Sequence, residues 1–511
     1  MSHRIFGREY PERVDALVIG GGVGGLTLAN LLAGGGLKVL LIERHWMLGG
    51  FCSTFRRRGF IFDAATHFYP LLGNPATLTG RILEKLKIPT EWVKMDPVDR
   101  FHIPGLDPFD VPADFDPYLA RLKQVFPGEQ AAIGAYFSEL RQAYLYGLLY
   151  YFRGVDDARA RRWENLTVED KLSQHFRDPR LRTLLMADNS HWGAVPGRTS
   201  FMFDAMLRLS YFLGNYYPKG SSQQFVDDLG QGLEDRGGWV ARCVEAERIL
   251  IENGRAGGVE IRTAAKRAAE RFTVRADYVI SNGDALHTYR DLIPETPPAL
   301  IARLGEMTPS HPCFLVHIGL RGIPQEQLNK IEGYYWDRCD PSAVLDTVFK
   351  IFTTTRFDPT LAPPDCATLI VQKVTPRRVE PGVDWEAHKA EVENYIMGRL
   401  RQILPGIDRH IVVKLSATSR TAFRYTMNLH GAMLGWEMSP DQLGAGRLPN
   451  ETPFENFYMV GHWTRPGGGI TPVMIGAQQV ARQILTGRAT AAPDPFFASI
   501  AGMQSQLPSH T

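Results

Sequence analysis

Three glycines near the start of the chain have the spacing of a loop that holds a diphosphate. Gly20, Gly22 and Gly25 follow an apolar run at 15–19 and precede another at 26–32. The first glycine permits a tight turn, the second lets a diphosphate approach the backbone, and the third lets a helix pack on a strand. Free N–H groups at the start of that helix favour a phosphate. The pattern predicts a strand, a turn and a helix that bind a nucleotide.

An acidic residue completes this unit. Glu43 ends the next apolar run, 38–42, and lies 23 residues after Gly20. A carboxylate at this distance can accept hydrogen bonds from a ribose diol. A glycine-rich turn without a nucleotide is the alternative, and the combination of strand, glycines, helix, strand and acid disfavours it.

A second glycine cluster lies near the other end of the chain. Residues 460–470 run from an apolar strand through three successive glycines, 467–469, into a predicted helix. The N-terminus of that helix can face a negative group, such as the pyrimidine side of a reduced flavin. Three glycines in a plain turn are entropically costly unless the backbone must come close to something. Two such elements suit a long dinucleotide, so the sequence favours FAD over NAD.

The segments between the two glycine clusters are predicted to alternate between two regions. The first sheet is expected to begin in segment 15–73. After a helix at 222–236, the chain is expected to return to this sheet and to add strands at 239–243, 246–251, 258–262, 271–274 and 278–281. Asn253-Gly254 is a hairpin signal between two of these strands. A mixed region with strands at 314–320 and 367–374 and a helix at 385–403 follows, and then a last strand at 457–460 and helix at 470–485.

This order predicts an α/β protein with a discontinuous, Rossmann-like FAD-binding domain, a mixed α+β substrate domain and a helical, aromatic-rich layer. The FAD-binding domain is assigned to 14–80, 218–284 and 452–487. The substrate and helical domain is assigned to 81–217 and 285–451. Residues 488–511 are expected to form a flexible tail, because they are rich in Ala, Pro, Ser and Gln.

The helical layer is expected between about 81 and 213. Its segment 137–152 is apolar almost all round and rich in tyrosine. A buried helix is one interpretation of this segment. A wall of an apolar substrate tunnel, or a membrane-surface patch with Arg141 and Arg153 at the interface, is the other.

Composition narrows the function classes. The 511 residues are too many for one core, and the net charge of +2 gives no reason to expect a nucleic-acid partner. The first ten residues do not resemble a secretory signal, and no apolar run is long enough for a spanning helix. No metal site is expected from the histidine spacing. Unpaired thiols in a reducing compartment are expected for the five cysteines, at positions 52, 243, 313, 339 and 366.

The chain resembles the FAD-dependent phytoene desaturase family, which includes bacterial carotenoid desaturases, carotenoid cis–trans isomerases and retinol saturases. The resemblance covers about residues 14–487, and the order and spacing of its motifs are specific. These motifs are 18–25, Glu43 with Gly49-Gly50, 59–64, 217–220, 281–284 with 287–291, and 460–461 with 466–470.

The resemblance implies particular roles for residues of this chain. Those implied near the FAD pyrophosphate are Gly20, Gly22, Val23, Gly24 and Gly25. Glu43 and Arg44 are implied at the adenosine ribose, and Gly49, Gly50 and Ser53 on the ribityl and phosphate side. Val244 is implied at the adenine, and Thr66 is implied to contact the cofactor. Those implied to close the flavin end are Gly461, His462, Gly469 and Ile470.

Some features depart from the family pattern. The sequence Ala65-Thr66-His67 replaces the glycine-containing sequence that often follows Phe-Asp-Ala. A histidine in this segment is more similar to the pattern of retinol saturases. His462 stands where many members have an acid or alanine. Residues 217–220 are similar to the isomerases and 287–291 to the desaturases. The mixture leaves the direction of the reaction open.

The candidate catalytic residues are His67, Tyr69 and Tyr217. His67 follows a strand expected to end beside the flavin, and a histidine can shuttle a proton near neutral pH. A packed, hydrogen-bonded histidine is the alternative, and structural roles are the alternative for both tyrosines. Cys52 lies near the expected phosphates rather than the flavin ring, so it is not expected to tether FAD.

The main hypothesis is therefore an FAD-dependent oxidoreductase of carbon–carbon bonds in a polyene or isoprenoid lipid, most simply a carotenoid desaturase. Reduction of the retinol-saturase kind and isomerisation with reduced FAD are alternatives. Two further alternatives belong to other functional classes: a non-catalytic lipid-binding escort protein and an amine oxidase. We expect a cytoplasmic protein attached to a membrane surface, because so apolar a substrate must come from a bilayer. The electron acceptor and the oligomeric state stay open.

Overall fold

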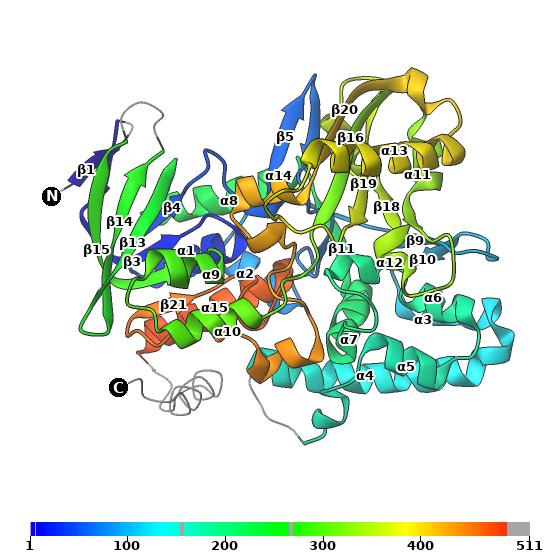
Figure 1. Cartoon of the computed structure of the whole chain (residues 1–511), viewed down its shortest axis with the longest axis horizontal. Coiled ribbons are helices and arrows are strands. Elements are labelled where there is room, and N and C mark those ends of the chain that lie inside the picture. Colours follow the sequence, from blue (N-terminus) through cyan, green and yellow to red (C-terminus); the bar gives the residue numbers. More distant parts are fainter. Residues whose placement is uncertain (1, 6, 154–157, 265–268, 488–511) are drawn as a thin grey trace.

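Three segments far apart in the sequence contribute strands to one sheet in the computed structural model (Figure 1). Its parallel strands are β3 (Arg13–Ile19), β4 (Val39–Glu43), β12 (Trp239–Arg242), β15 (Arg271–Ser281) and β21 (Phe457–Met459). The strand order is β12-β4-β3-β15-β14-β13, with β21 beside β15. The antiparallel strands are β13 (Val244–Glu252) and β14 (Arg255–Thr263). The structure describes residues 2–5, 7–153, 158–264 and 269–487, without side chains at 149–153.

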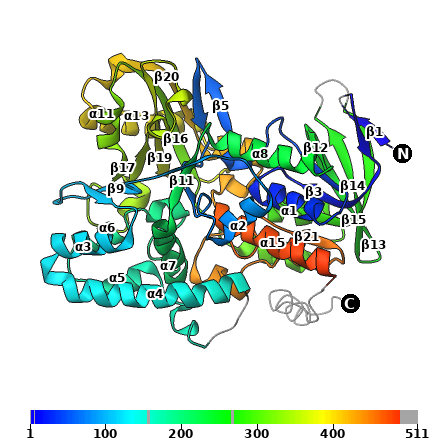
Figure 2. The same ribbon diagram turned by 180° about the vertical axis from the view of Figure 1, so that it is seen from behind.

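The apolar run that opens this sheet is buried on both faces, as expected for a parallel strand. Ala16 and Val18 pack with one face of helices, whereas Val14 and Leu17 pack on the other side. The helices of the first face are α1 (Val23–Gly34), α2 (Leu78–Lys85), α8 (Ser222–Asp235) and α15 (Ile470–Thr486). The other face carries α9 (Ala285–His287) and α10 (Pro298–Glu306). Figure 2 shows α1, α8 and α15 from behind.

The predicted hairpin is confirmed, but one predicted break in the sheet is wrong. Asn253 and Gly254 have φ of 52° and 79°, as a tight hairpin turn between β13 and β14 requires. Segments 271–274 and 278–281 form one strand, β15, instead of two. Its first half pairs antiparallel with β14 and its second half parallel with β3. Asp277, which lies between the two predicted segments, pairs with Arg13 at 2.5 Å.

A second, seven-stranded sheet forms the core of the other half of the molecule. Its order is β10-β9-β17-β18-β19-β16-β20. These strands are β9 (Asp99–His102), β10 (Phe109–Val111), β16 (Cys313–Arg321), β17 (Gly333–Tyr335), β18 (Phe349–Phe352), β19 (Cys366–Val374) and β20 (Ile411–Ala417). One face packs on α13 (Trp385–Ile403), with α11 (Gln325–Ile331) nearby. The strands and the helix predicted in 314–403 are confirmed.

The helical layer closes the open side of this half, as Figure 1 shows below the second sheet. Its helices are α3 (Phe115–Val125), α4 (Gln130–Arg153), α5 (Val168–His175), α6 (Pro179–Leu185) and α7 (Phe201–Ser210). The expectation of helix throughout 81–213 is wrong, because β9 and β10 extend the second sheet. β8 (Trp92–Lys94) pairs with β11 (Asn215–Pro218). These strands are short and carry charged residues, so apolar alternation did not reveal them.

The remaining elements are small. They are β1 (Ser2–Ile5), β2 (Arg8–Pro11), β5 (Thr54–Arg57), β6 (Phe60–Asp63), β7 (Tyr69–Pro70), α12 (Ala343–Asp346) and α14 (Ser419–Thr426). β1 and β2 pair antiparallel near the start of the chain. Within the described ranges, no helix combines the length and the apolar character that a bilayer crossing demands. The predicted flexible tail, 488–511, lies outside the described residues, as do the side chains at 149–152 of the aromatic helix.

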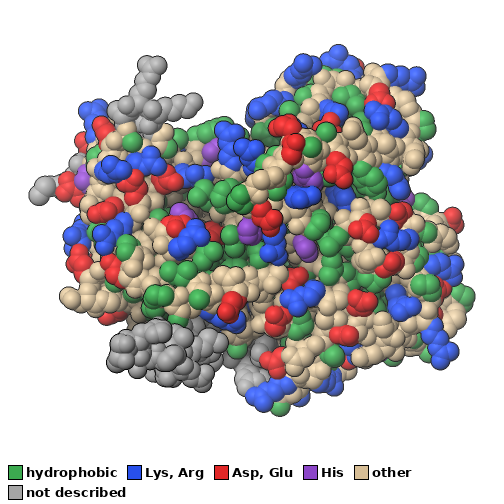
Figure 3. Space-filling model, viewed as in Figure 1, with side chains coloured by type: hydrophobic (Ala, Val, Ile, Leu, Met, Phe, Trp, Pro, Cys, Tyr) green, Lys and Arg blue, Asp and Glu red, His purple; other side chains and the backbone are tan. Residues whose placement is uncertain are grey.

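The visible surface carries both signs of charge in mixture. Figure 3 shows lysine and arginine side chains interspersed with aspartate and glutamate, and hydrophobic and histidine side chains gathered between the two halves.

Inside the helical layer, Arg208 lies between Asp188 at 3.1 Å and Asp204 at 3.0 Å. All three side chains are at most 3% exposed.

We predict that Arg208→Met destabilises the fold by about 3–5 kcal/mol, because it leaves two buried carboxylates without their cation. Urea unfolding followed by circular dichroism measures this loss. Arg338→Met, at an exposed ion pair with Asp346, is the control and should leave the unfolding midpoint unchanged. Equal effects of both substitutions would contradict the assigned role of Arg208.

Candidate functional site

A large cavity opens where the parallel strands of the first sheet end. β3, β4, β15 and β21 end beside it at Ile19, Glu43, Ser281 and Met459, and α1 and α15 begin there. Ligands of open α/β sheets bind at these carboxyl ends. The cavity encloses about 1340 Å³ of empty space, counting its open mouth. Its lining extends from Glu43 and Val244 past the glycine loop to His462 and Ile470, so it joins the two glycine clusters, as a bound dinucleotide would require.

Most of the predicted cofactor residues meet in the wall of this cavity. They are Gly20, Gly22, Val23, Gly24, Glu43, Arg44, Gly49, Gly50, Thr66, Val244, Gly461, His462, Gly469 and Ile470. Two predicted residues lie outside the wall. Gly25 packs inside the turn, where an added Cβ would lie 2.2 Å from the Gly20 carbonyl oxygen. Ser53 uses its hydroxyl to donate to the Gly50 carbonyl at 2.8 Å.

The glycine loop presents free backbone donors to the cavity. Helix α1 begins at Val23 with no side-chain cap. Among the described residues, the N–H groups of Val23 and Gly24 have no hydrogen-bond acceptor. Gly20 has a φ of 98°, which favours glycine. A diphosphate is the ligand that such a helix start accommodates.

Asn282 holds the loop from the opposite side, although the sequence did not identify it as a site residue. Its Nδ2 donates to the Gly20 carbonyl at 3.3 Å. A Cβ on Gly24 or Gly461 would lie 2.7 Å from its Oδ1. Asn282 therefore lies where the start of the chain, the end of β15 and the last segment converge. In the sequence, Asn282 belongs to the motif 281–284, but this motif did not indicate which residues Asn282 would contact.

Glu43 organises the adenosine side of the cavity. Its carboxylate accepts from the backbone N–H of Gly21 at 2.8 Å and of His45 at 2.7 Å. Burial raises the pKa of Glu43, and these backbone donors oppose the shift. Arg44 approaches Glu245 at 3.9 Å and donates to the Arg424 carbonyl at 2.8 Å. A carboxylate fixed in this way is placed to meet a ribose diol.

The other end of the cavity is held by an asparagine that the sequence did not reveal. Asn428 Oδ1 lies 3.0 Å from His462 Nε2 and accepts from Trp463 Nε1 at 3.1 Å. Burial and the nearby Arg447 charge lower the pKa of His462 to about 3, so this ring is neutral. Gly469, with a φ of 103°, stands before α15.

Arg447 lies one layer behind this wall. Its side chain is fully buried, and its guanidinium donates to the carbonyls of His462 at 2.6 Å and Thr464 at 3.1 Å. No carboxylate of the described chain forms an ion pair with it, and burial lowers its pKa to about 9. Arg447 stays charged at neutral pH and fixes the loop that precedes α15. No motif indicated it, because a lone arginine carries no pattern.

The three predicted catalytic residues are not in the cavity wall. His67 directly follows the wall residue Thr66, and its ring lies 4.2 Å from that of Phe352. Its side chain is 1% exposed, and neither ring nitrogen has a described hydrogen-bond partner. Burial, with the nearby His317 and Lys350, holds the pKa of His67 well below 6.5. His67 is therefore a neutral base beside the cavity.

The two tyrosines have packing and hydrogen-bonding environments of their own. Tyr217 donates from its hydroxyl to Asp63 at 2.6 Å and stacks on Phe357. Tyr69 packs against the rings of Trp92 and Phe225. Both side chains are fully buried. Their positions indicate support for the segment that carries His67.

The cavity wall contains one of the five cysteines. All five cysteines are unpaired, and burial raises the pKa of Cys52, which lies in the cavity wall, to about 11. Across the described residues, no group of three or more His, Cys, Asp or Glu side chains is placed to hold a metal ion. The free N–H groups, the glycine cradle and the fixed carboxylate together fit FAD.

Comparison with known proteins agrees with this geometry. The family model described as flavin-containing amine oxidoreductase matches residues 23–485. An oxidoreductase structure from Methanosarcina mazei superposes with a TM-score of 0.66 at 19% identity, covering 92% of this chain and 100% of that one. This likeness shows the shared fold.

Two curated relatives are informative. The all-trans-retinol 13,14-reductase of Danio rerio is 29% identical over 64% of this chain, and the match spans only 57% of that protein's length. The lycopene-forming phytoene desaturase of a Paracoccus species is 25% identical over 94% of this chain and 99% of its own length.

We predict that Gly25→Ala lowers FAD retention several-fold, because its Cβ would meet the Gly20 backbone, which cannot swing aside. The flavin-to-protein absorbance ratio of the purified protein measures the loss. Gly34→Ala is the matched control on the same helix, since its Cβ would meet only the Arg236 side chain at 3.9 Å. Full FAD content in Gly25→Ala would contradict the assignment of the loop.

Proposed function

The chain belongs to the family of flavin-containing amine oxidoreductases, and we propose that it is an FAD-dependent oxidoreductase of carbon–carbon bonds in a polyene or isoprenoid lipid. The observation that carries this proposal is an apolar cluster on the second sheet that reaches the FAD cavity. Its buried members are Phe60, Phe62, Cys313, Leu315, Phe352, Ile370 and Val374. Met433 packs on this cluster and also lines the cavity. An apolar chain bound along the cluster therefore adjoins the cofactor.

Desaturation is the reaction that we propose first. Bound FAD supplies an acceptor for a hydride. The adjacent carbon must also lose a proton. His67 lies beside the cavity as a neutral base, and neither of its ring nitrogens has a hydrogen-bond partner among the described residues. The apolar surroundings exclude water, which protects the reacting carbon. Tyr69 and Tyr217 act through the position of His67 rather than on the substrate.

Reduction of a double bond is a second candidate, favoured by the named activity of the Danio rerio relative. In that direction a group beside the substrate must donate a proton. Since the pKa of His67 is lowered well below 6.5, its imidazole is neutral at neutral pH and lacks the second, acidic proton of an imidazolium. This supports desaturation over reduction with His67 as the proton-transfer group.

Peripheral attachment to a membrane is part of the proposal, because an apolar substrate is stored in bilayers. The helical layer exposes leucines that suit such a surface. Leu145 on α4 is 56% exposed and Leu213, just after α7, is 44% exposed. Apolar side chains of this kind enter the interfacial region of a bilayer.

We predict that His67→Gln lowers kcat for polyene desaturation at least 100-fold while FAD content is retained. General-base catalysis contributes about 10²–10⁴-fold. Mass analysis of products after incubation with carotenoids and retinoids measures the reaction: loss of two hydrogens indicates desaturation, gain of two indicates reduction, and no change indicates isomerisation. Gain of two hydrogens would favour the second candidate.

The pH profile gives an independent check of His67. Its pKa is lowered, so the basic form is present above that value and is lost as the pH falls through it. We predict that the acid limb of kcat/KM lies below pH 6.5 and disappears in His67→Gln. A limb at or above pH 6.5 that persists in the variant would exclude His67 as the base.

For the membrane, we predict that Leu145→Glu with Leu213→Glu weakens binding to phosphatidylcholine–phosphatidylglycerol vesicles several-fold in a flotation assay. Burial of a leucine side chain contributes about 1.5–3 kcal/mol, and a glutamate opposes insertion. Leu485→Glu, at a leucine 42% exposed on α15, is the control and should bind as the unmodified protein does. Unchanged binding of the double variant would contradict the assigned surface.

A further inference from the structure

The inner face of the second sheet carries a row of polar side chains. Tyr334, Lys350 and Gln372 lie directly opposite one another on β17, β18 and β19. Residues that pair in this way project from the same face of a sheet. They are 1%, 4% and 4% exposed. A site for a pure hydrocarbon would not need three buried polar groups in line.

This row adjoins both the apolar cluster and the FAD cavity. Gln372 Nε2 lies 3.4 Å from the sulfur of Met433, which lines the cavity. Lys350 Nζ lies 4.3 Å from the ring centre of Phe352, and Phe352 also packs against His67. A molecule that extends from the cavity along the cluster therefore meets the row.

The polar groups of the row are incompletely hydrogen-bonded. Among the described residues, the Tyr334 hydroxyl and Gln372 Oε1 have no partner, and neither ring nitrogen of the adjacent His67 has one. Buried polar atoms in folded proteins are almost always paired. The row is therefore complete only with a ligand that both donates and accepts hydrogen bonds.

The charge of the row is already balanced. Lys350 Nζ pairs with Asp99 Oδ2 at 2.5 Å, and both side chains are at most 8% exposed. No surplus cation is left here to match a carboxylate. The missing ligand group is therefore uncharged.

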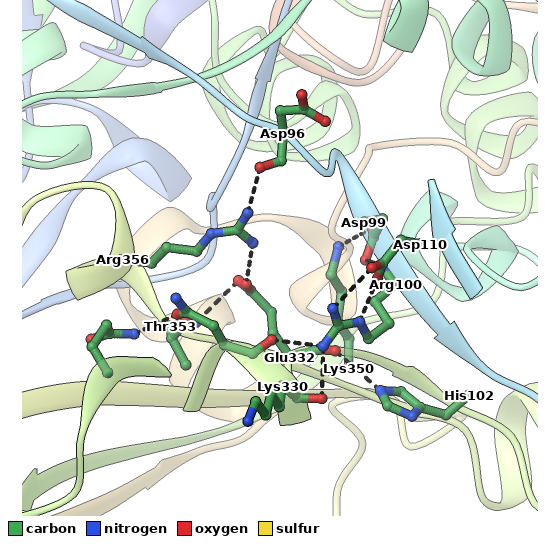
Figure 4. A network of polar contacts seen from close by, with 12 residues as sticks. Asp96, Asp99, Arg100, His102, Asp110, Lys330, Glu332, Lys350, Thr353 and Arg356 are labelled. Atoms are coloured by element: carbon green, nitrogen blue, oxygen red, sulfur yellow. Dashed lines mark hydrogen bonds and ion pairs between the residues drawn. The ribbon is translucent and has the colours of Figure 1, made fainter. Parts of the chain in front are cut away.

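A second cavity opens on the same lysine. Its charged lining residues are Asp99, Arg100, Glu332, Lys350 and Arg356. Arg356 pairs with Glu332 at 2.7 Å and donates to the Asp96 carbonyl, while Arg100 pairs with Asp110 (Figure 4). Lys350 and Phe352 line this cavity, and the paired arginines do not compete for the ligand.

We propose that the row of Tyr334, Lys350 and Gln372 binds a hydroxyl group at one end of the substrate. A hydroxyl donates one hydrogen bond and accepts two. It can donate to Gln372 Oε1 and accept from Tyr334 and Lys350. The substrate class is then a polyene or isoprenoid alcohol rather than a bare hydrocarbon, and the row fixes which bond lies beside FAD. This inference rests on the proposed function.

Binding to the FAD-loaded protein tests the proposal with two matched pairs. One pair is all-trans-retinol and the same polyene without oxygen, and the other is zeaxanthin and β-carotene. All-trans-retinoic acid supplies the charged comparison. The dissociation constant is read from the perturbed flavin absorbance. We expect the alcohol of at least one pair to bind at least tenfold more tightly than its hydrocarbon, because unmatched buried polar groups reject the hydrocarbon. Retinoic acid should bind more weakly than retinol.

Three variants locate this preference. Gln372→Met removes the acceptor with little change in size, and Lys350→Met with Asp99→Asn removes the ion pair without leaving a single charge. Both should reduce the preference to less than twofold. Lys373→Met is the matched control, since Lys373 is 7% exposed on the opposite face of β19 and donates to the Leu345 carbonyl. It should retain the preference.

The possible failures are distinguishable. If both members of each pair bind equally, or the hydrocarbons bind more tightly, the hydroxyl site is overturned and the proposed function stands. Tightest binding by retinoic acid also overturns it. If no polyene binds or reacts, both the site and the proposed function are overturned. A preference that survives in Gln372→Met and in the double variant overturns the assigned residues.

Discussion

The architecture depends on the close approach of three chain segments around Asn282. Its amide reaches the Gly20 carbonyl, and its oxygen lies where a Cβ on Gly24 or Gly461 would intrude. Glycine is required because any side chain would hold the segments apart. This contact joins the end of β15 to the first loop and to the segment before α15. It explains why one FAD site needs residues from both ends of a 511-residue chain.

The FAD cavity and the apolar cluster meet where the half built on the first sheet joins the half built on the second sheet. The first sheet supplies a rigid cradle whose free N–H groups and fixed Glu43 fit a dinucleotide. The second sheet supplies an apolar cluster that ends at Met433 in the cavity wall. His67 lies between them as a buried neutral base, and the row around Lys350 adds a polar end to an otherwise apolar surface. In the proposed function, this face of the second sheet positions the substrate, and His67, which packs against Phe352 on the same face, accepts the proton.

The sequence predicted the first sheet well because its signals are local. The glycine spacing, the apolar runs and Asn253-Gly254 each report the backbone of their own segment. It failed where contacts are long-range. Lys350 and Gln372 carry no pattern until β18 and β19 pair, and Arg447 becomes notable only through its burial. The single strand β15 was predicted as two strands, 271–274 and 278–281. Asp277, which lies between these segments, forms an ion pair with Arg13 from another part of the chain.

Anaerobic reduction of the bound flavin tests the central claim most directly. The FAD-loaded protein is mixed with a polyene or with putrescine, and the flavin absorbance is followed in a stopped-flow instrument. We predict that the polyene bleaches the flavin band and that putrescine leaves it unchanged. Rapid bleaching by the amine, with none by any polyene, would contradict it.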